Sequence, residues 1–135
     1  MPVPPPRARP AKPASQPSVY LGDESAAVRA GVSDRLRADG IHVSTASDRG
    51  DPERDTASIG GFKCALLHLD RIDGKADAID FAELLRVYQP TLPVAFLHEH
   101  ASEALVSRAR LVGPLFKVPD GLDAAHEWAR DQARR

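Results

Sequence analysis

The chain has 135 residues, of which 42% are hydrophobic, and a formal net charge of −1 at pH 7. This length corresponds to one domain. No stretch approaches the roughly 18 consecutive apolar residues that a membrane span needs, and the start lacks the apolar segment of a signal peptide. The single cysteine excludes an internal disulfide. Together these features predict a cytoplasmic protein without a membrane partner.

Residues 1–18 form a proline-rich leader. They contain seven of the 12 prolines and three basic residues but no acidic one. Such a segment cannot bury apolar surface, so we expect it to be disordered or polyproline-like. Residues 19–135 are then the folded domain, with a net charge of −4. A mildly acidic domain is a poor binder of phosphate groups, so direct contact with nucleic acid is not expected.

Short apolar runs alternate with helical patterns along the rest of the chain. The expected strands are 19–21, 41–45, 64–69, 94–97 and 115–118. The expected helices are 25–39, 77–88, 102–112 and 120–135, with a short, ragged helix between 46 and 61. Strands that alternate with helices in this way predict an α/β fold with a parallel sheet covered on both faces.

Local signals define several of these elements. Gly40 is placed to end the first helix as a C′ residue, and Ser102 followed by Glu103 is typical of a helix start. Helical spacing predicts inward-facing side chains in two further helices, namely Ala78, Phe81, Leu85 and Tyr88 in one and Leu122, Ala125 and Trp128 in the other.

The most informative stretch is Cys64–Asp70, where an apolar strand ends in His68 and Asp70. Four consecutive apolar residues suit a strand that is buried on both faces. In parallel sheets, ligands and chemistry collect at the carboxyl ends of central strands. We therefore expect the functional site at this strand end.

Several stretches, in this order, resemble the receiver domain of bacterial two-component response regulators across nearly all of residues 19–135. They are Val19–Glu24, Leu66–Leu69, Leu92–Glu103 and Gly113–Pro119. The resemblance implies a flavodoxin-like (CheY-like) doubly wound, five-stranded parallel sheet in the order 2-1-3-4-5. It also places the site over the ends of the first and third strands.

The resemblance also implies roles for individual residues. The acidic pair that would hold a magnesium ion falls on Asp23 and Glu24. The position of the phospho-accepting aspartate falls on His68, and that of the small hydroxyl residue falls on His98.

The lysine position of the family falls on Val118 when the chain is aligned on Pro119. Lys117 lies one residue early, so it would point to the opposite face of the strand. The match at Pro119 makes Val118–Pro119 a candidate cis peptide. With His68 and His98, three of the five working positions differ from the family. The prediction is therefore a pseudo-receiver: a non-enzymatic signalling module that binds a protein without being phosphorylated.

Alternatives remain open at this site. Asp70 could be the acceptor if the strand register were shifted by two residues, with magnesium on Asp23 and Glu24. His68 and His98 could instead ligate a metal ion in a flavodoxin-like protein. His68 could also be a cation that pairs with the acidic residues and replaces magnesium.

The resemblance further implies a partner surface on the last two helices and the last strand. Its expected members are Arg108, Arg110, Leu115, Lys117, His126 and Arg130. The partner would be a kinase, another receiver or an output domain, with a homodimer as an alternative.

Overall fold

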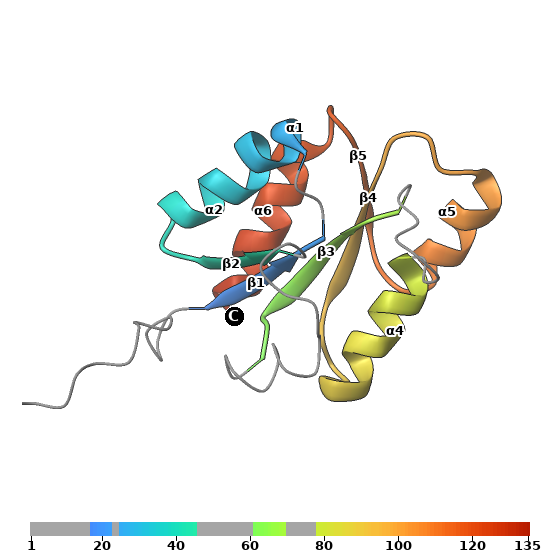
Figure 1. Ribbon diagram of the computed structural model, residues 1–135, viewed down its shortest axis with the longest axis horizontal. Helices are drawn as coiled ribbons and strands as arrows, with labels where there is room; N and C mark the ends of the chain where they lie inside the picture. Colours follow the sequence, from blue (N-terminus) through green and yellow to red (C-terminus); the bar gives the residue numbers. More distant parts are fainter. Residues whose placement is uncertain (1–16, 23–24, 46–60, 70–77) are drawn as a thin grey trace, which may run out of the picture.

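The structure, a computed structural model, describes residues 17–22, 25–45, 61–69 and 78–135. Five strands in this part of the chain form one parallel sheet (Figure 1). They are β1 (Ser18–Leu21), β2 (His42–Thr45), β3 (Cys64–His68), β4 (Val94–His98) and β5 (Leu115–Lys117). Their spatial order is β2-β1-β3-β4-β5. The predicted flavodoxin-like sheet in the order 2-1-3-4-5 is therefore confirmed.

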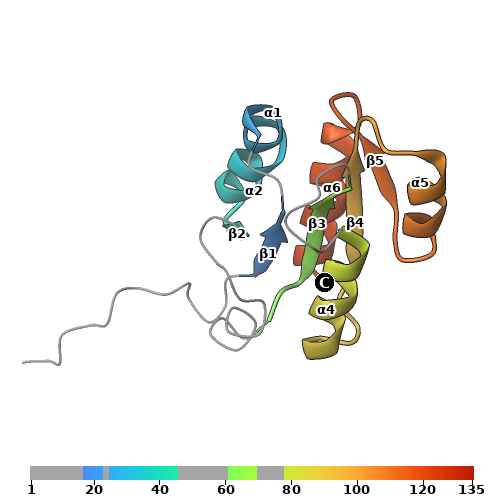
Figure 2. The same cartoon turned by 45° about the vertical axis from the view of Figure 1, so that its right-hand side comes forward.

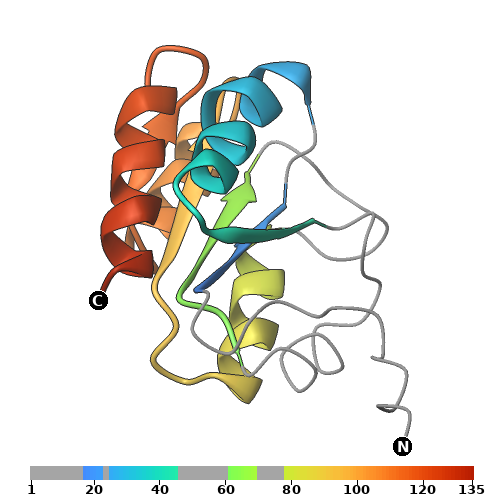
Figure 3. The same cartoon turned by 90° about the vertical axis from the view of Figure 1, so that its left-hand side faces the viewer.

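Helices cover both faces of this sheet. They are α1 (Ala26–Val28), the π-helical η1 (Arg29–Ser33), α2 (Asp34–Ala38), α4 (Ala78–Tyr88), α5 (Glu103–Arg110) and α6 (Leu122–Ala133). The continuous α1–η1–α2 helix and α6 pack on one face, whereas α4 and α5 pack on the other (Figure 2). Figure 3 shows α6, in red, beside the blue and cyan first helix.

The sheet separates two apolar cores, and the central strand β3 contributes to both. Cys64 and Leu66 belong to the core under α6, while Ala65 and Leu67 belong to the core under α4 and α5. Side chains of a strand alternate between its two faces, so a strand covered on both sides must be apolar at every position. This requirement explains the continuous apolar run that the sequence shows here.

The predicted helix signals are borne out. The Ser25 hydroxyl accepts a hydrogen bond from the backbone N–H of Val28 at 3.4 Å. The Ser102 hydroxyl accepts one from Leu105 at 3.2 Å. Gly40 follows α2 with a φ of 82°, the left-handed conformation that favours glycine.

The first and last helices differ from the prediction. The first helix contains a π-helical segment, and Gly31 in that segment lies so near α6 that a Cβ atom would come within 3.0 Å of Leu122 Cδ1. The last helix begins at Leu122 rather than Asp120, after a turn that includes the predicted cis Val118–Pro119 bond.

The prediction that Tyr88 faces inward was wrong, because this side chain is 40% exposed. The buried face of α4 instead runs through Ala78, Ala82 and Leu85. This spacing of three and four residues continues to Gln89, whose side chain contacts the backbone of Phe62, two residues before β3. Gln89 Oε1 accepts a hydrogen bond from Phe62 N–H at 2.8 Å, and Gln89 Nε2 donates one to the Phe62 carbonyl.

Several predictions fall on residues outside the described ranges, namely most of the leader (1–16), nearly all of the expected helix between 46 and 61, and Asp77 at the start of the helix expected over 77–88. Ser18, predicted to belong to the leader, instead pairs with His42 in the sheet. Among the described helices, none is long and apolar enough to cross a membrane.

The Cys64 thiol provides a test of the core. Its side chain is fully buried, and this burial raises the pKa of the thiol to about 12. The thiolate is the reactive form, so we expect no reaction with iodoacetamide at pH 8 in the folded protein and complete reaction in urea. Mass spectrometry would show one added group only after unfolding. Rapid labelling of the folded chain would contradict this packing.

Gly113 provides a second test, because it brings the chain from α5 back against β4. A Cβ atom on Gly113 would lie 1.8 Å from the carbonyl oxygen of Val94. We expect Gly113→Ala to lower the free energy of unfolding by about 3 kcal/mol, at the upper end of overpacking effects. Urea denaturation would measure the change.

The comparison variant is Gly40→Ala, since nothing lies within 4 Å of a Cβ atom there. Its cost comes only from the positive φ and should be about 1 kcal/mol. Equal losses in the two variants would contradict the close approach at Gly113.

Candidate functional site

Three neighbouring strands end at the same edge of the sheet. Their last residues are His68 in β3, His98 in β4 and Lys117 in β5. Backbone pairing puts His68 opposite Leu97 and His98 opposite Lys117. The predicted site residues therefore gather at the edge where parallel sheets of this kind bind ligands.

The acidic residues predicted for this site lie outside the described ranges. These are Asp23 and Glu24 after β1, and Asp70 after β3. The magnesium site and the alternative acceptor Asp70 therefore stay predictions. The described part of the site consists of the strand ends themselves.

The two histidines reach the same edge but belong to opposite faces. Side chains two or four residues apart in a strand point to the same face of the sheet. His68 therefore shares the face of Cys64, in the core under α6, whereas His98 shares the face of Phe96, in the core under α4 and α5. Metal binding by His68 and His98 together with Asp23 or Glu24 involves residues outside the described ranges, so it stays a prediction. Within the described ranges, no three residues of metal-binding type come together.

The end of β5 carries its charge on the α5 side of the sheet. Val118, which stands at the lysine position implied by the family resemblance, is 7% exposed and lies in the core under α6. Lys117 is exposed and points to the other face, as its one-residue offset predicts. Val118–Pro119 is a cis peptide bond, as predicted.

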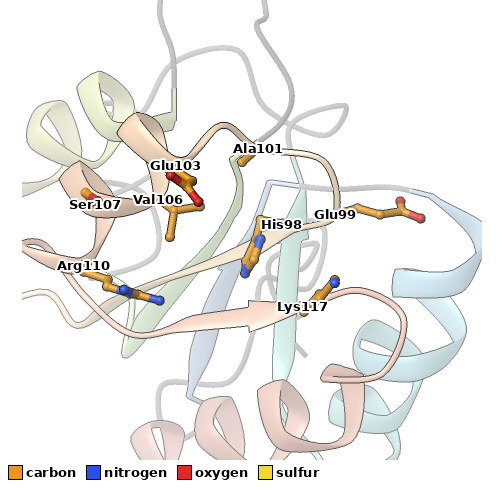
Figure 4. Close-up of a pocket in the computed structure, with 8 residues that line it drawn as sticks. All are labelled: His98, Glu99, Ala101, Glu103, Val106, Ser107, Arg110 and Lys117. Atoms are coloured by element: carbon orange, nitrogen blue, oxygen red, sulfur yellow. The ribbon is translucent and has the colours of Figure 1, made fainter.

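Lys117 and His98 line a pocket of about 360 Å³ between α5 and the ends of β4 and β5 (Figure 4). The other lining residues are Glu99, Ala101, Glu103, Val106, Ser107 and Arg110. Sequence reasoning did not identify this pocket. A signal was present, because the four α5 residues follow the spacing i, i+3, i+4, i+7 and so share one helix face.

His126 does not belong to the predicted partner surface. Its side chain is only 5% exposed, and its Nε2 lies 2.9 Å from Asp39 Oδ2. An ionised carboxylate only accepts hydrogen bonds, so Nε2–H is the donor. The reason for burial is helical spacing: in α6, His126 lies on the same buried face as Leu122 and Ala129. Of the other expected members, Arg108, Arg110 and Lys117 are exposed, whereas Leu115 and Arg130 are half-buried.

This partly buried contact joins the end of α2 to α6. The hydrogen bond from His126 holds the pKa of the Asp39 carboxyl below its ordinary value, and the charges of Arg130 and Arg134 act in the same direction. A carboxylate just after a helix meets the negative end of the helix dipole, so Asp39 depends on these α6 side chains. The contact is structural and lies away from the strand ends.

Comparisons with known proteins agree with this architecture. No family model matches the sequence, and no curated protein matches it in sequence. The solved structures that match include a response regulator receiver protein from Sinorhizobium medicae, with a TM-score of 0.69 and 15% identity over 88% of this chain and 95% of that chain.

Two further matches are similar. The chemotaxis protein CheY4 of Vibrio cholerae has a TM-score of 0.66 and 17% identity over 86% of this chain and 98% of its own. The beryllofluoride-activated NtrC4 receiver domain dimer has a TM-score of 0.68 and 18% identity, over 87% and 96%. This chain therefore has the fold of response regulator receiver domains.

The Asp39–His126 contact predicts a pH dependence of stability. Because the pKa of Asp39 is lowered in the folded state, its ionised form stabilises the fold. The contribution is complete above the ordinary carboxyl value of about 4 and is lost as the pH falls through the lower folded value. We expect Asp39→Asn to lower the melting temperature at pH 6 and to have a smaller effect at pH 3.

The matched control is Asp34→Asn at the start of α2, since within the described ranges the Asp34 carboxylate forms an ion pair only with the exposed Arg37, at 4.0 Å. Its effect should be small at both pH values. A loss of stability in Asp39→Asn that is the same at pH 6 and pH 3 would contradict the assignment.

Proposed function

We propose that this chain is a pseudo-receiver, a non-enzymatic module that acts in cytoplasmic signal transduction by binding a protein partner without being phosphorylated. The receiver fold supports a signalling role, since the matched structures include response regulator receiver proteins. The partner would be a sensor kinase, another receiver or an output domain. The alternatives are a phospho-receiver that uses Asp70 with magnesium held by Asp23 and Glu24, and a flavodoxin-like protein that binds a metal ion through His68 and His98.

The observation that carries the proposal is the placement of charge at the end of β5. Receiver chemistry requires a positive group to stabilise the phosphoryl charge over the acceptor. In this chain the corresponding residue is the buried Val118, and the ammonium group of Lys117 lies on the α5 side of the sheet. Lys117 therefore lies on the wrong face to take over this role.

The ends of β3 and β4 support the same conclusion. His68 stands where the family resemblance places the acceptor carboxylate, and His98 stands where it places a small hydroxyl. Neither imidazole supplies the carboxylate oxygen to which magnesium and the phosphoryl group would bind.

The proposed partner surface is formed by α5, β5 and α6. Without His126, its expected members are Arg108, Arg110, Leu115, Lys117 and Arg130. The structure adds Leu111, which is 90% exposed. An exposed leucine beside basic side chains is the composition of an interface anchor with a polar rim. One matched receiver is a dimer, and a second copy of this chain is an alternative partner.

The decisive test is the response to a phosphoryl mimic. We expect magnesium and beryllofluoride to cause no saturable change in the amide NMR signals of Leu66–Leu69 and Leu97–His98. Saturable changes at these residues would overturn the proposal.

Two variants identify the cause of any response. If the changes disappear in Asp70→Asn but persist in the matched control Asp131→Asn, which lies on the exposed side of α6, Asp70 is a phospho-acceptor. A separate titration with Zn²⁺ that shifts the His68 or His98 ring signals would favour the metal-binding alternative.

A further inference from the structure

We propose that the pocket between α5 and β5 binds a small oxyanion, a phosphate or a carboxylate, through Arg110, His98 and Lys117. The pocket shares Arg110 and Lys117 with the proposed partner surface, and binding there does not require phosphorylation. The fold alone does not provide the site, because binding depends on the side chains that line the pocket. An oxyanion bound there would provide the module with a ligand-binding site that adjoins its proposed partner surface.

Three nitrogen-bearing side chains reach the pocket from three different elements. His98 ends β4, Lys117 ends β5 and Arg110 ends α5. His98 and Lys117 are paired in the sheet, so they project side by side on the same face. Figure 4 shows Arg110 extending toward His98, with Lys117 on the other side of the imidazole. A guanidinium, an ammonium and an imidazole are the donor set that recognises oxyanions.

The positive groups of the pocket are not neutralised within the described ranges. Within the described ranges, neither the guanidinium group of Arg110 nor the ammonium group of Lys117 forms an ion pair or hydrogen bond. Of the two lining carboxylates, Glu99 lies 3.8 Å from His100 and is directed away from the pocket centre (Figure 4). The two cations therefore keep their donors available for a ligand.

The shape of the pocket also suits a small ligand. Its volume of about 360 Å³ lies at the lower end of the range for ligand sites, about 300–1,000 Å³. Val106 and Ala101 provide an apolar wall, which reduces the local dielectric and strengthens the attraction between charges. The donors come from strand ends and a helix, so their positions are fixed by the fold rather than by a loop.

The negative charge of Glu103 repels a bound oxyanion, which gives the proposal a test of opposite sign. Its carboxylate lines the pocket from the first turn of α5. Because like charges repel, the Glu103 carboxylate weakens the binding of an oxyanion in the pocket without abolishing it. Removing this one charge should therefore strengthen binding, whereas removing the charge of Arg110 or Lys117 should weaken it.

The test is an NMR titration of the full chain with inorganic phosphate and, separately, with succinate. The ionic strength is kept constant with chloride, because surface charges are screened by salt. We expect saturable shifts at His98, Glu103, Arg110 and Lys117. Tighter binding of phosphate would indicate a phosphorylated ligand, and tighter binding of succinate would indicate a carboxylate; either result supports the proposal.

Four variants define the site. Arg110→Gln and Lys117→Gln should each weaken binding about tenfold, equivalent to about 1.4 kcal/mol, and Glu103→Gln should strengthen it. Arg108→Gln is the matched control, because it removes the same charge from the same helix outside the pocket lining. Shifts that do not saturate, or an equal loss of affinity in Arg108→Gln and Arg110→Gln, would overturn the proposal. Because no partner and no beryllofluoride is present, failure here leaves the pseudo-receiver proposal intact.

Discussion

The strict alternation of side chains along the buried strands is the constraint on which the site depends. In a parallel sheet covered on both faces, a shift of one residue moves a side chain from one core to the other. At the end of β5, this rule separates Val118, in the core under α6, from Lys117, in the pocket beside α5. A single residue between the lysine and Pro119 therefore changes which face of the molecule carries the charge.

The same alternation explains why the two histidines have different surroundings. His68 and His98 end adjacent strands, yet they belong to the environments of different helices. The helices that cover each face determine the surroundings of each ring. Apolar side chains fill the space under α6, on the face of His68, whereas the space beside α5, on the face of His98, is a polar pocket. The site is thus divided between two faces rather than concentrated over the central strand.

Much of the fold could be predicted from the sequence, because it depends on local patterns. Apolar runs located all five strands, and Ser102 and Gly40 marked helix ends through their own backbone chemistry. The contact between His126 and Asp39 could not be predicted in this way, since the two residues are 87 positions apart. A basic residue on an amphipathic helix resembles an exposed one until its partner on another helix is known.

The pocket was missed for a related reason, since it combines one helix face with two strand ends. Periodicity along α5 places Glu103, Val106 and Arg110 on one side, but only the sheet register brings His98 and Lys117 opposite them. His98 belongs to both the expected phosphorylation site and the α5 pocket. By family resemblance it replaces the hydroxyl of a phosphorylation site, and by geometry it is the central wall of the α5 pocket. In the proposed module, a ligand in this pocket would contact His98 at the end of β4, the position that responds to phosphorylation in ordinary receivers. It would also contact Lys117, a member of the proposed partner surface.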